Sequence, residues 1–125
     1  MRLLTAALLT SACVAGCGGN RTAKTERIKN LSQVELAEIH STLDALNRKG
    51  APMNLSVKSL PPAIARLEPE SVMIRYDSAR IHVAGAFDDK VYVFVNGIGT
   101  SQKDKEIVLS PGEREPQQVL WRRPR

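Results

Sequence analysis

The chain has 125 residues, of which 42% are hydrophobic and 4% aromatic, and it carries a formal net charge of +5. This length suits one small domain with a modest core. The positive charge permits an anionic partner but does not require one.

The first residues have the features of a secretory signal peptide. Arg2 supplies a positive charge, and a short apolar stretch over residues 3–12 ends in small side chains. That stretch is too short for a membrane-spanning helix, which needs about 20 apolar residues. No second apolar run of that length follows. Because of the signal-peptide features, we expect the protein to be exported.

The next segment, Val14-Ala15-Gly16-Cys17, closely resembles the lipobox of bacterial lipoproteins. The resemblance covers the first 17 residues, and no family is recognised for the rest of the chain. It implies that the Cys17 thiol is joined to a diacylglycerol and that a signal peptide of residues 1–16, with Cys13, is removed. The alternative is an ordinary signal peptide cut nearby, which would leave Cys17 as a free or disulfide-bonded thiol.

The lipobox resemblance implies a location in the bacterial cell envelope. Several acyl chains on Cys17 would anchor the protein permanently, because each buried methylene contributes about 0.8 kcal/mol. In lipoproteins of enteric-type bacteria, aspartate after this cysteine is associated with the inner membrane, and here the residue is Gly18. This favours the outer membrane, facing the periplasm. Nucleic acid is not an expected partner there.

Residues 17–30 are polar and mostly without pattern. We expect them to form a flexible membrane tether, followed by a single small domain over residues 31–125. As a random coil the tether would span roughly 20 Å. Its cations, Arg21 and Lys24 among them, would either face anionic head groups or remain solvated.

The strongest local pattern predicts a helix over about residues 32–49. Ser32 and Glu35 have the spacing of a capping box, and Gly50 is suited to end the helix. A shorter second helix is predicted over residues 60–67, with proline in its first turn. The apolar stripe of the long helix consists of Leu36, Ile39, Leu43 and Leu46.

In the second half of the chain, apolar residues alternate with polar ones or form short β-branched runs. Turn-rich gaps separate the first strands, which favours an antiparallel β-meander of about four to five strands. The expected fold class is α+β, with both helices packed on the meander. The strand-forming segments lie at 54–58, 72–76, 81–83, 91–95, 107–109 and 119–121.

The sequence contains no nucleophile-elbow serine, HExxH motif or P-loop. We expect no enzyme activity, no cofactor and no metal. His40 lies beside the apolar stripe and is expected to be partly exposed. His82 could in principle join Asp88 and Asp89 in a metal site. Adjacent aspartates in a strand point to opposite faces, however, and they also suit a turn.

The segment 91–95 is apolar at every position, so it places apolar side chains on both faces of the sheet. If its valines face the long helix, its two aromatic residues lie on the opposite face. A tight turn at 77–80 would place Arg75 opposite His82 on that face. The alternative is that the short helix or the segment with Trp121 covers it. The predicted partner-binding residues are Met73, Arg75, His82, Tyr92 and Phe94.

These features predict a membrane-anchored envelope lipoprotein that acts as a protein-binding or inhibitory, immunity-type module. The missing catalytic motifs and the small size favour this function. The alternatives are a small envelope enzyme, a ligand-binding module, or a structural lipoprotein with no discrete activity.

Overall fold

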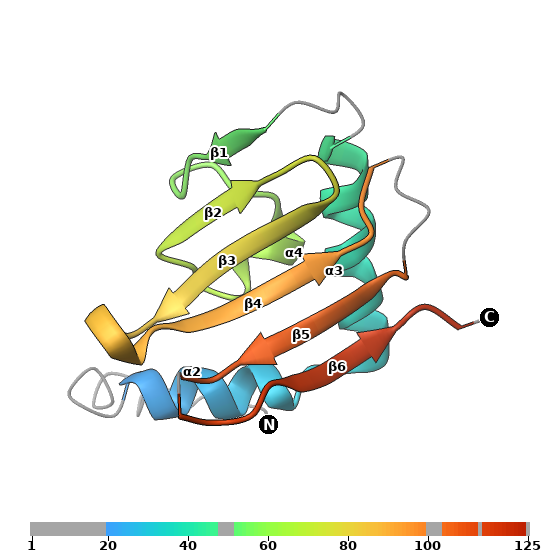
Figure 1. Ribbon diagram of the computed structural model, residues 1–125. Coiled ribbons are helices and arrows are strands. Elements are labelled where there is room, and N and C mark those ends of the chain that lie inside the picture. Colours follow the sequence, from blue (N-terminus) through green and yellow to red (C-terminus); the bar gives the residue numbers. More distant parts are fainter. Residues whose placement is uncertain (1–19, 48–51, 100–103, 113, 125) are drawn as a thin grey trace, which may run out of the picture.

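Figure 1 shows the computed structural model of the chain, which describes residues 20–47, 52–99, 104–112 and 114–124. The signal peptide, the lipobox and Cys17 therefore lie outside the described residues, as does Gly50. Within the described ranges, no helix is both long and apolar enough to cross a membrane.

Six strands form one antiparallel sheet in the order β1-β2-β3-β4-β5-β6. Each strand pairs with its neighbour in sequence, as in the predicted meander. The sheet has six strands rather than four or five, because the short segments at both edges also pair. The strands are β1 (Met53–Leu55), β2 (Ser71–Ile74), β3 (Ser78–Ala84), β4 (Val91–Asn96), β5 (Glu106–Ser110) and β6 (Gln118–Arg122).

The described helices are α2 (Asn20–Lys29), α3 (Gln33–Leu46) and α4 (Pro62–Ala65), with a 3-10 turn, η3 (Phe87–Asp89), between β3 and β4. All three α-helices lie behind the sheet in Figure 1, on one of its two faces. One core therefore fills the space between the helices and the sheet, and the mixed α+β class is confirmed.

Helix α3 begins as predicted. The Glu35 amide donates to the Ser32 hydroxyl at 3.0 Å, and the Ser32 amide donates to the Glu35 carboxylate at 2.9 Å, which completes the capping box. These bonds lower the pKa of the Glu35 carboxyl below its ordinary value. Leu36, Ile39 and Leu43 are buried in the core.

The expectation of a flexible tether over 17–30 is wrong for residues 20–29, which form helix α2 and pack against the domain. Ile28 is 1% exposed and belongs to the core, and Lys24 is 8% exposed. The Lys24 ammonium donates to two backbone carbonyls. The polar sequence does not indicate a docked helix, because at a buried position such as Lys24 hydrogen bonds take the place of apolar contact.

Candidate functional site

Strand β4 has one face in the core and one outside it. Val91, Val93 and Val95 are fully buried with the helix-facing residues of β2 and β3, whereas Tyr92 and Phe94 lie on the opposite face and are half-buried. The first of the two predicted arrangements is therefore the observed one. Trp121 packs against His40 of α3, on the helix side, so it does not cover the opposite face.

The strand register brings five side chains together on this opposite face. Met73 pairs with Arg80, Arg80 with Phe94, and His82 with Tyr92. We call Met73, Arg80, His82, Tyr92 and Phe94 the aromatic face.

Contacts between these side chains form a continuous chain. The Tyr92 ring centre lies 5.4 Å from that of His82 and 5.6 Å from that of Phe94. The guanidinium carbon of Arg80 lies 5.3 Å from the centre of the Tyr92 ring, within the range of a cation–π interaction. Arg80 Nη2 also lies 4.0 Å from Met73 Sδ. The aromatic face is therefore held in one arrangement by its own contacts.

Arg75 does not lie opposite His82, so that prediction is wrong. The Arg75 amide donates to the Ser78 carbonyl at 2.7 Å and closes the β2–β3 hairpin there. This turn places Ser71 opposite His82 on one side, while Tyr92 lies opposite on the other. Arg75 is instead exposed beyond the end of β2.

Arg75 and Met73 line a cavity of about 300 Å³ at the end of the β1–β2 pair. Tyr76, which is 71% exposed, also lines it. Because Met73 belongs to both, the cavity is continuous with the aromatic face. A cavity of this size can receive an apolar side chain or a small ligand.

Arg80 is the residue of this surface that the sequence prediction missed. A usable signal was present, because Arg80 and His82 are two positions apart in one strand and must share a face. The turn between these strands was predicted at 77–80, and that position placed Arg75, rather than Arg80, on the face of His82.

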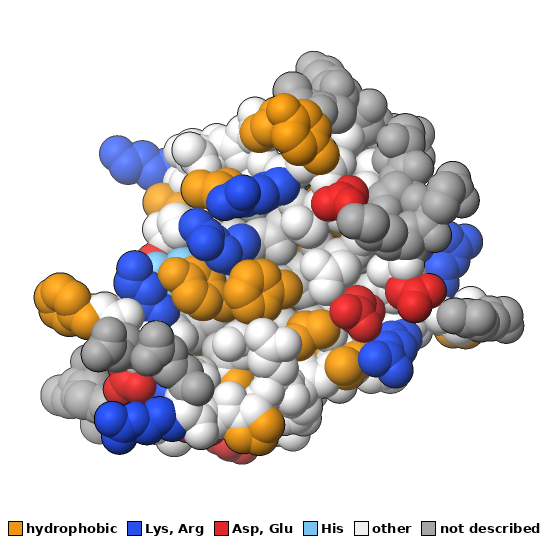
Figure 2. All heavy atoms as spheres, in the orientation of Figure 1, with side chains coloured by type: hydrophobic (Ala, Val, Ile, Leu, Met, Phe, Trp, Pro, Cys, Tyr) orange, Lys and Arg blue, Asp and Glu red, His pale blue; other side chains and the backbone are white. Residues whose placement is uncertain are grey.

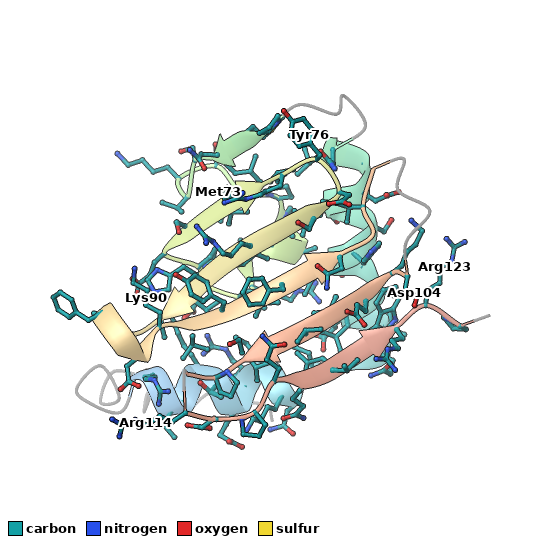
Figure 3. The ribbon with its side chains drawn as sticks, viewed as in Figure 1. Met73, Tyr76, Lys90, Asp104, Arg114 and Arg123 are labelled. Carbon is teal, nitrogen blue, oxygen red and sulfur yellow. The ribbon has the colours of Figure 1, made fainter. Side chains whose placement is uncertain are left out.

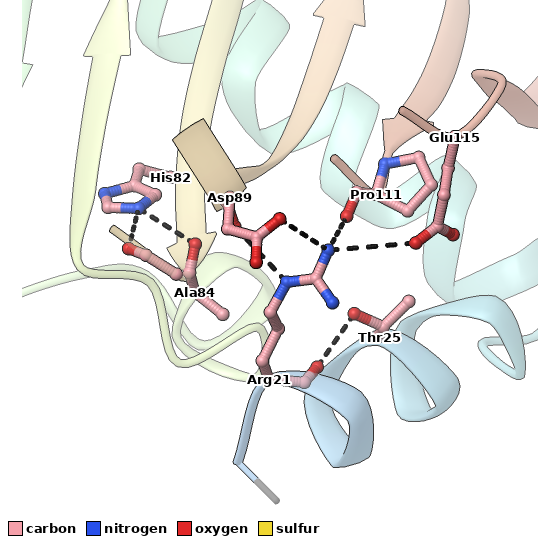
Figure 4. Close-up of polar contacts among 8 residues, drawn as sticks. Arg21, Thr25, His82, Ala84, Asp89, Pro111 and Glu115 are labelled. Carbon is pink, nitrogen blue, oxygen red and sulfur yellow. Dashed lines mark hydrogen bonds and ion pairs between the residues drawn. The ribbon is translucent and has the colours of Figure 1, made fainter. Parts of the chain in front are cut away.

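His82 is oriented by an irregularity of strand β3. The register shifts between His82 and Ala84, and His82 Nε2 donates to the carbonyls of Ala84 and Gly85, both at 3.0 Å. Its Nδ1 lies 3.7 Å from a carboxylate oxygen of Glu70. Figure 4 shows Asp89 turned toward Arg21 rather than toward His82. Within the described part of the chain, no three His, Cys, Asp or Glu residues are placed to hold a metal ion.

His40 is buried rather than partly exposed, which corrects the prediction. Its Nε2 donates to the Asn96 carbonyl at 2.9 Å, and its ring centre lies 5.0 Å from that of Trp121. Burial lowers the pKa of His40, and the nearby Lys105 lowers it further, against the opposing effect of the Asn96 bond. The imidazole is therefore neutral near pH 7 and serves the contact between α3 and the sheet.

Charge is unevenly distributed around the aromatic face. In Figure 2, Lys and Arg side chains gather beside the hydrophobic side chains in the middle of the sheet, and acidic side chains lie toward the opposite end of the strands. Arg75 and Lys90 are exposed, and Arg80 is half-buried. The surface thus combines aromatic rings with positive charge.

Comparison of the chain with protein-family models, with curated proteins and with solved structures gives no match.

Proposed function

We propose that this chain is a lipid-anchored protein of the bacterial cell envelope that binds a protein partner through its aromatic face. The lipobox-like segment that ends at Cys17 supports the anchor. The aromatic face, which none of the described helices covers, supports the binding function, and it is the observation that carries this proposal.

The aromatic face suits protein binding because it is partly exposed, preformed by its own contacts and of the right composition. The described helices all pack on the other face of the sheet, so within the described part of the chain Tyr92 and Phe94 remain partly accessible. Tyrosine and arginine are among the residues that contribute most to protein interfaces. Since Arg80 and the rings already contact each other, little side-chain entropy is lost on binding.

The chemistry of the surface indicates the kind of partner. Arg75, Arg80 and Lys90 favour a partner whose apolar contact residues are bordered by carboxylates. The cavity beside Met73 would receive one apolar side chain of that partner. A preformed surface of this kind fits an inhibitory, immunity-type module, which acts by covering its target.

The lipid anchor is tested by metabolic labelling with a fatty acid analogue. The wild-type chain is expected to be labelled and to fractionate with membranes, whereas Cys17→Ala is expected to do neither. Labelling of the Cys17→Ala protein would refute lipidation at this residue.

The binding surface is tested by placing a photocrosslinking amino acid at Phe94 in the lipidated protein in its native cells. We expect one discrete crosslinked species, whose partner mass spectrometry identifies. The same amino acid at Val34, which is 78% exposed on α3, is the matched control. Arg80→Glu is expected to abolish the Phe94 crosslink. The proposal fails if Phe94 gives no crosslink, or if both positions give the same one.

A further inference from the structure

The turn that joins β3 to β4 presents the most exposed large hydrophobic side chain among the described residues. Phe87 in η3 is 92% exposed, and its backbone has a φ of 54°, a conformation that costs a non-glycine residue free energy. An exposed aromatic ring on such a backbone gains nothing from the fold around it. A ring exposed to this extent is available for a contact outside the domain.

Hydrogen bonds and a close backbone approach hold the β3–β4 turn in a compact conformation. The Asp89 amide donates to the Ala86 carbonyl at 3.0 Å. Gly85 has a φ of 82°, and a Cβ at this position would lie 2.0 Å from the Asp89 carbonyl oxygen. The His82 ring donates to the carbonyls of Ala84 and Gly85 at the base of the turn. Phe87 is thus held outward by a compact backbone.

This turn lies directly beside the start of helix α2. Arg21 Nε donates to the Asp89 carbonyl at 3.2 Å, and Arg21 Nη2 donates to the Pro111 carbonyl and lies 3.9 Å from the Glu115 carboxylate (Figure 4). The first turn of α2 is therefore fixed to both the β3–β4 turn and the β5–β6 connection.

The fixed start of α2 limits how far the domain can lie from a lipid on Cys17. Three residue steps separate Cys17 from Asn20, and even a fully extended chain spans only about 10 Å over that length. A bilayer that holds the acyl chains would therefore lie next to the β3–β4 turn. Lys90 and Arg114 are exposed at this same end of the sheet (Figure 3), where they can meet lipid phosphates.

We propose that the β3–β4 turn is a membrane-contact site, and that Phe87 inserts into the interfacial layer of the bilayer beside the lipid anchor. The occupant of this surface is the lipid that surrounds the anchor, and the proposal rests on the lipidation of Cys17. Aromatic rings are favoured at this depth of a bilayer. Insertion would fix the orientation of the domain and leave the aromatic face accessible from the periplasm.

The experiment measures the depth of two probes in lipidated full-length protein reconstituted into vesicles of phosphatidylethanolamine and phosphatidylglycerol. Phe87→Cys carries a fluorophore, and vesicle lipids carry a nitroxide quencher in the upper acyl chain. The added thiol is the only free one, because Cys13 leaves with the signal peptide and Cys17 is blocked by lipid. Tyr76→Cys, an exposed aromatic position at the opposite end of β3, is the matched control.

We expect the probe at Phe87 to be quenched several-fold more strongly than the probe at Tyr76. If the protein floats with vesicles but the two probes are quenched equally, or the probe at Phe87 is not quenched, the membrane-contact site is refuted. Protein that does not float with vesicles refutes the lipid anchor itself, and the membrane-contact site falls with it. The two failures are thus distinguished by flotation.

Discussion

The side-chain ammonium of Lys24 in helix α2 donates a hydrogen bond of 2.7 Å to the backbone carbonyl of Val83 in strand β3. Val83 lies at the register shift between His82 and Ala84, so its carbonyl is available to a side chain. The same ammonium donates to the Glu68 carbonyl at 2.7 Å. One buried cation thus joins α2 to the sheet and to the segment after α4.

Replacing Lys24 by methionine should therefore destabilise the domain. The buried Val83 carbonyl and the partly buried Glu68 carbonyl lose their donor, and leaving a buried group unsatisfied costs about 1–3 kcal/mol. Chemical denaturation measures the change in the free energy of unfolding. Thr22→Ala, at an exposed position of the same helix, is the control and should have little effect. Equal stability of Lys24→Met and wild type would mean that α2 is not docked in solution.

Leu43→Ala should cost about 2–5 kcal/mol of folding free energy, because Leu43 is fully buried where α3 packs on the sheet. Val34→Ala, at an exposed position of the same helix, should change stability by less than about 0.5 kcal/mol. Thermal or denaturant unfolding of the two variants checks the difference. Similar losses in both would contradict the assignment of the core face.

Stability should fall as the pH decreases below about 6.5, the ordinary pKa of histidine. The folded state holds His40 neutral with a lowered pKa, so the unfolded state binds the proton more readily in this range. Above this pH, His40 is neutral in both the folded and the unfolded state and does not make the free energy of unfolding depend on pH. Denaturant midpoints at about pH 7.5 and about pH 5.5 measure the effect.

The chain has two histidines, so each serves as a control for the other. His40→Gln should reduce the pH dependence, and His82→Gln should leave the part that is due to His40. If the His40→Gln variant kept the same pH dependence of stability as the wild type, His40 would not be its cause.

Gly85→Ala should destabilise the β3–β4 turn, since the added methyl group would collide with the Asp89 carbonyl and alanine tolerates a φ of 82° poorly. We expect a loss of at least about 1 kcal/mol in the free energy of unfolding. Ala86→Ser, at the exposed neighbouring position, is the control. If Gly85→Ala were as stable as the control, the turn would be less compact than described, and the outward position of Phe87 would lose its support.

The sequence predicted the elements whose signal is carried by apolar residues or by local capping. The stripe with Leu43 and the Ser32–Glu35 box defined α3, and the apolar run around Val93 predicted strand β4, although which of its faces lies in the core was left open. These signals are local and do not depend on the rest of the chain.

Helix α2 was missed because its buried face is mostly polar. Arg21, Lys24, Thr25 and Ile28 have the i, i+3, i+4, i+7 spacing of one helix face, but only Ile28 is apolar. Their partners lie far away in sequence, on β3, after α4 and in the β5–β6 connection, and no local pattern can reveal them. Arg80 was missed for a different reason: its spacing from His82 was a usable local signal, but the turn was predicted at 77–80, which assigned Arg80 to the turn.

The order of the strands affects how the chain acquires its structure. Since every strand pairs with its sequence neighbour, the sheet can grow hairpin by hairpin from contacts of short range, which favours rapid folding. The helices differ from the sheet in this respect: the bonds of α2, for example, reach residues 59 and 90 positions further along the chain. Helix α2 is thus synthesised before the sheet, yet it reaches its final place only after β3 and the β5–β6 connection have formed.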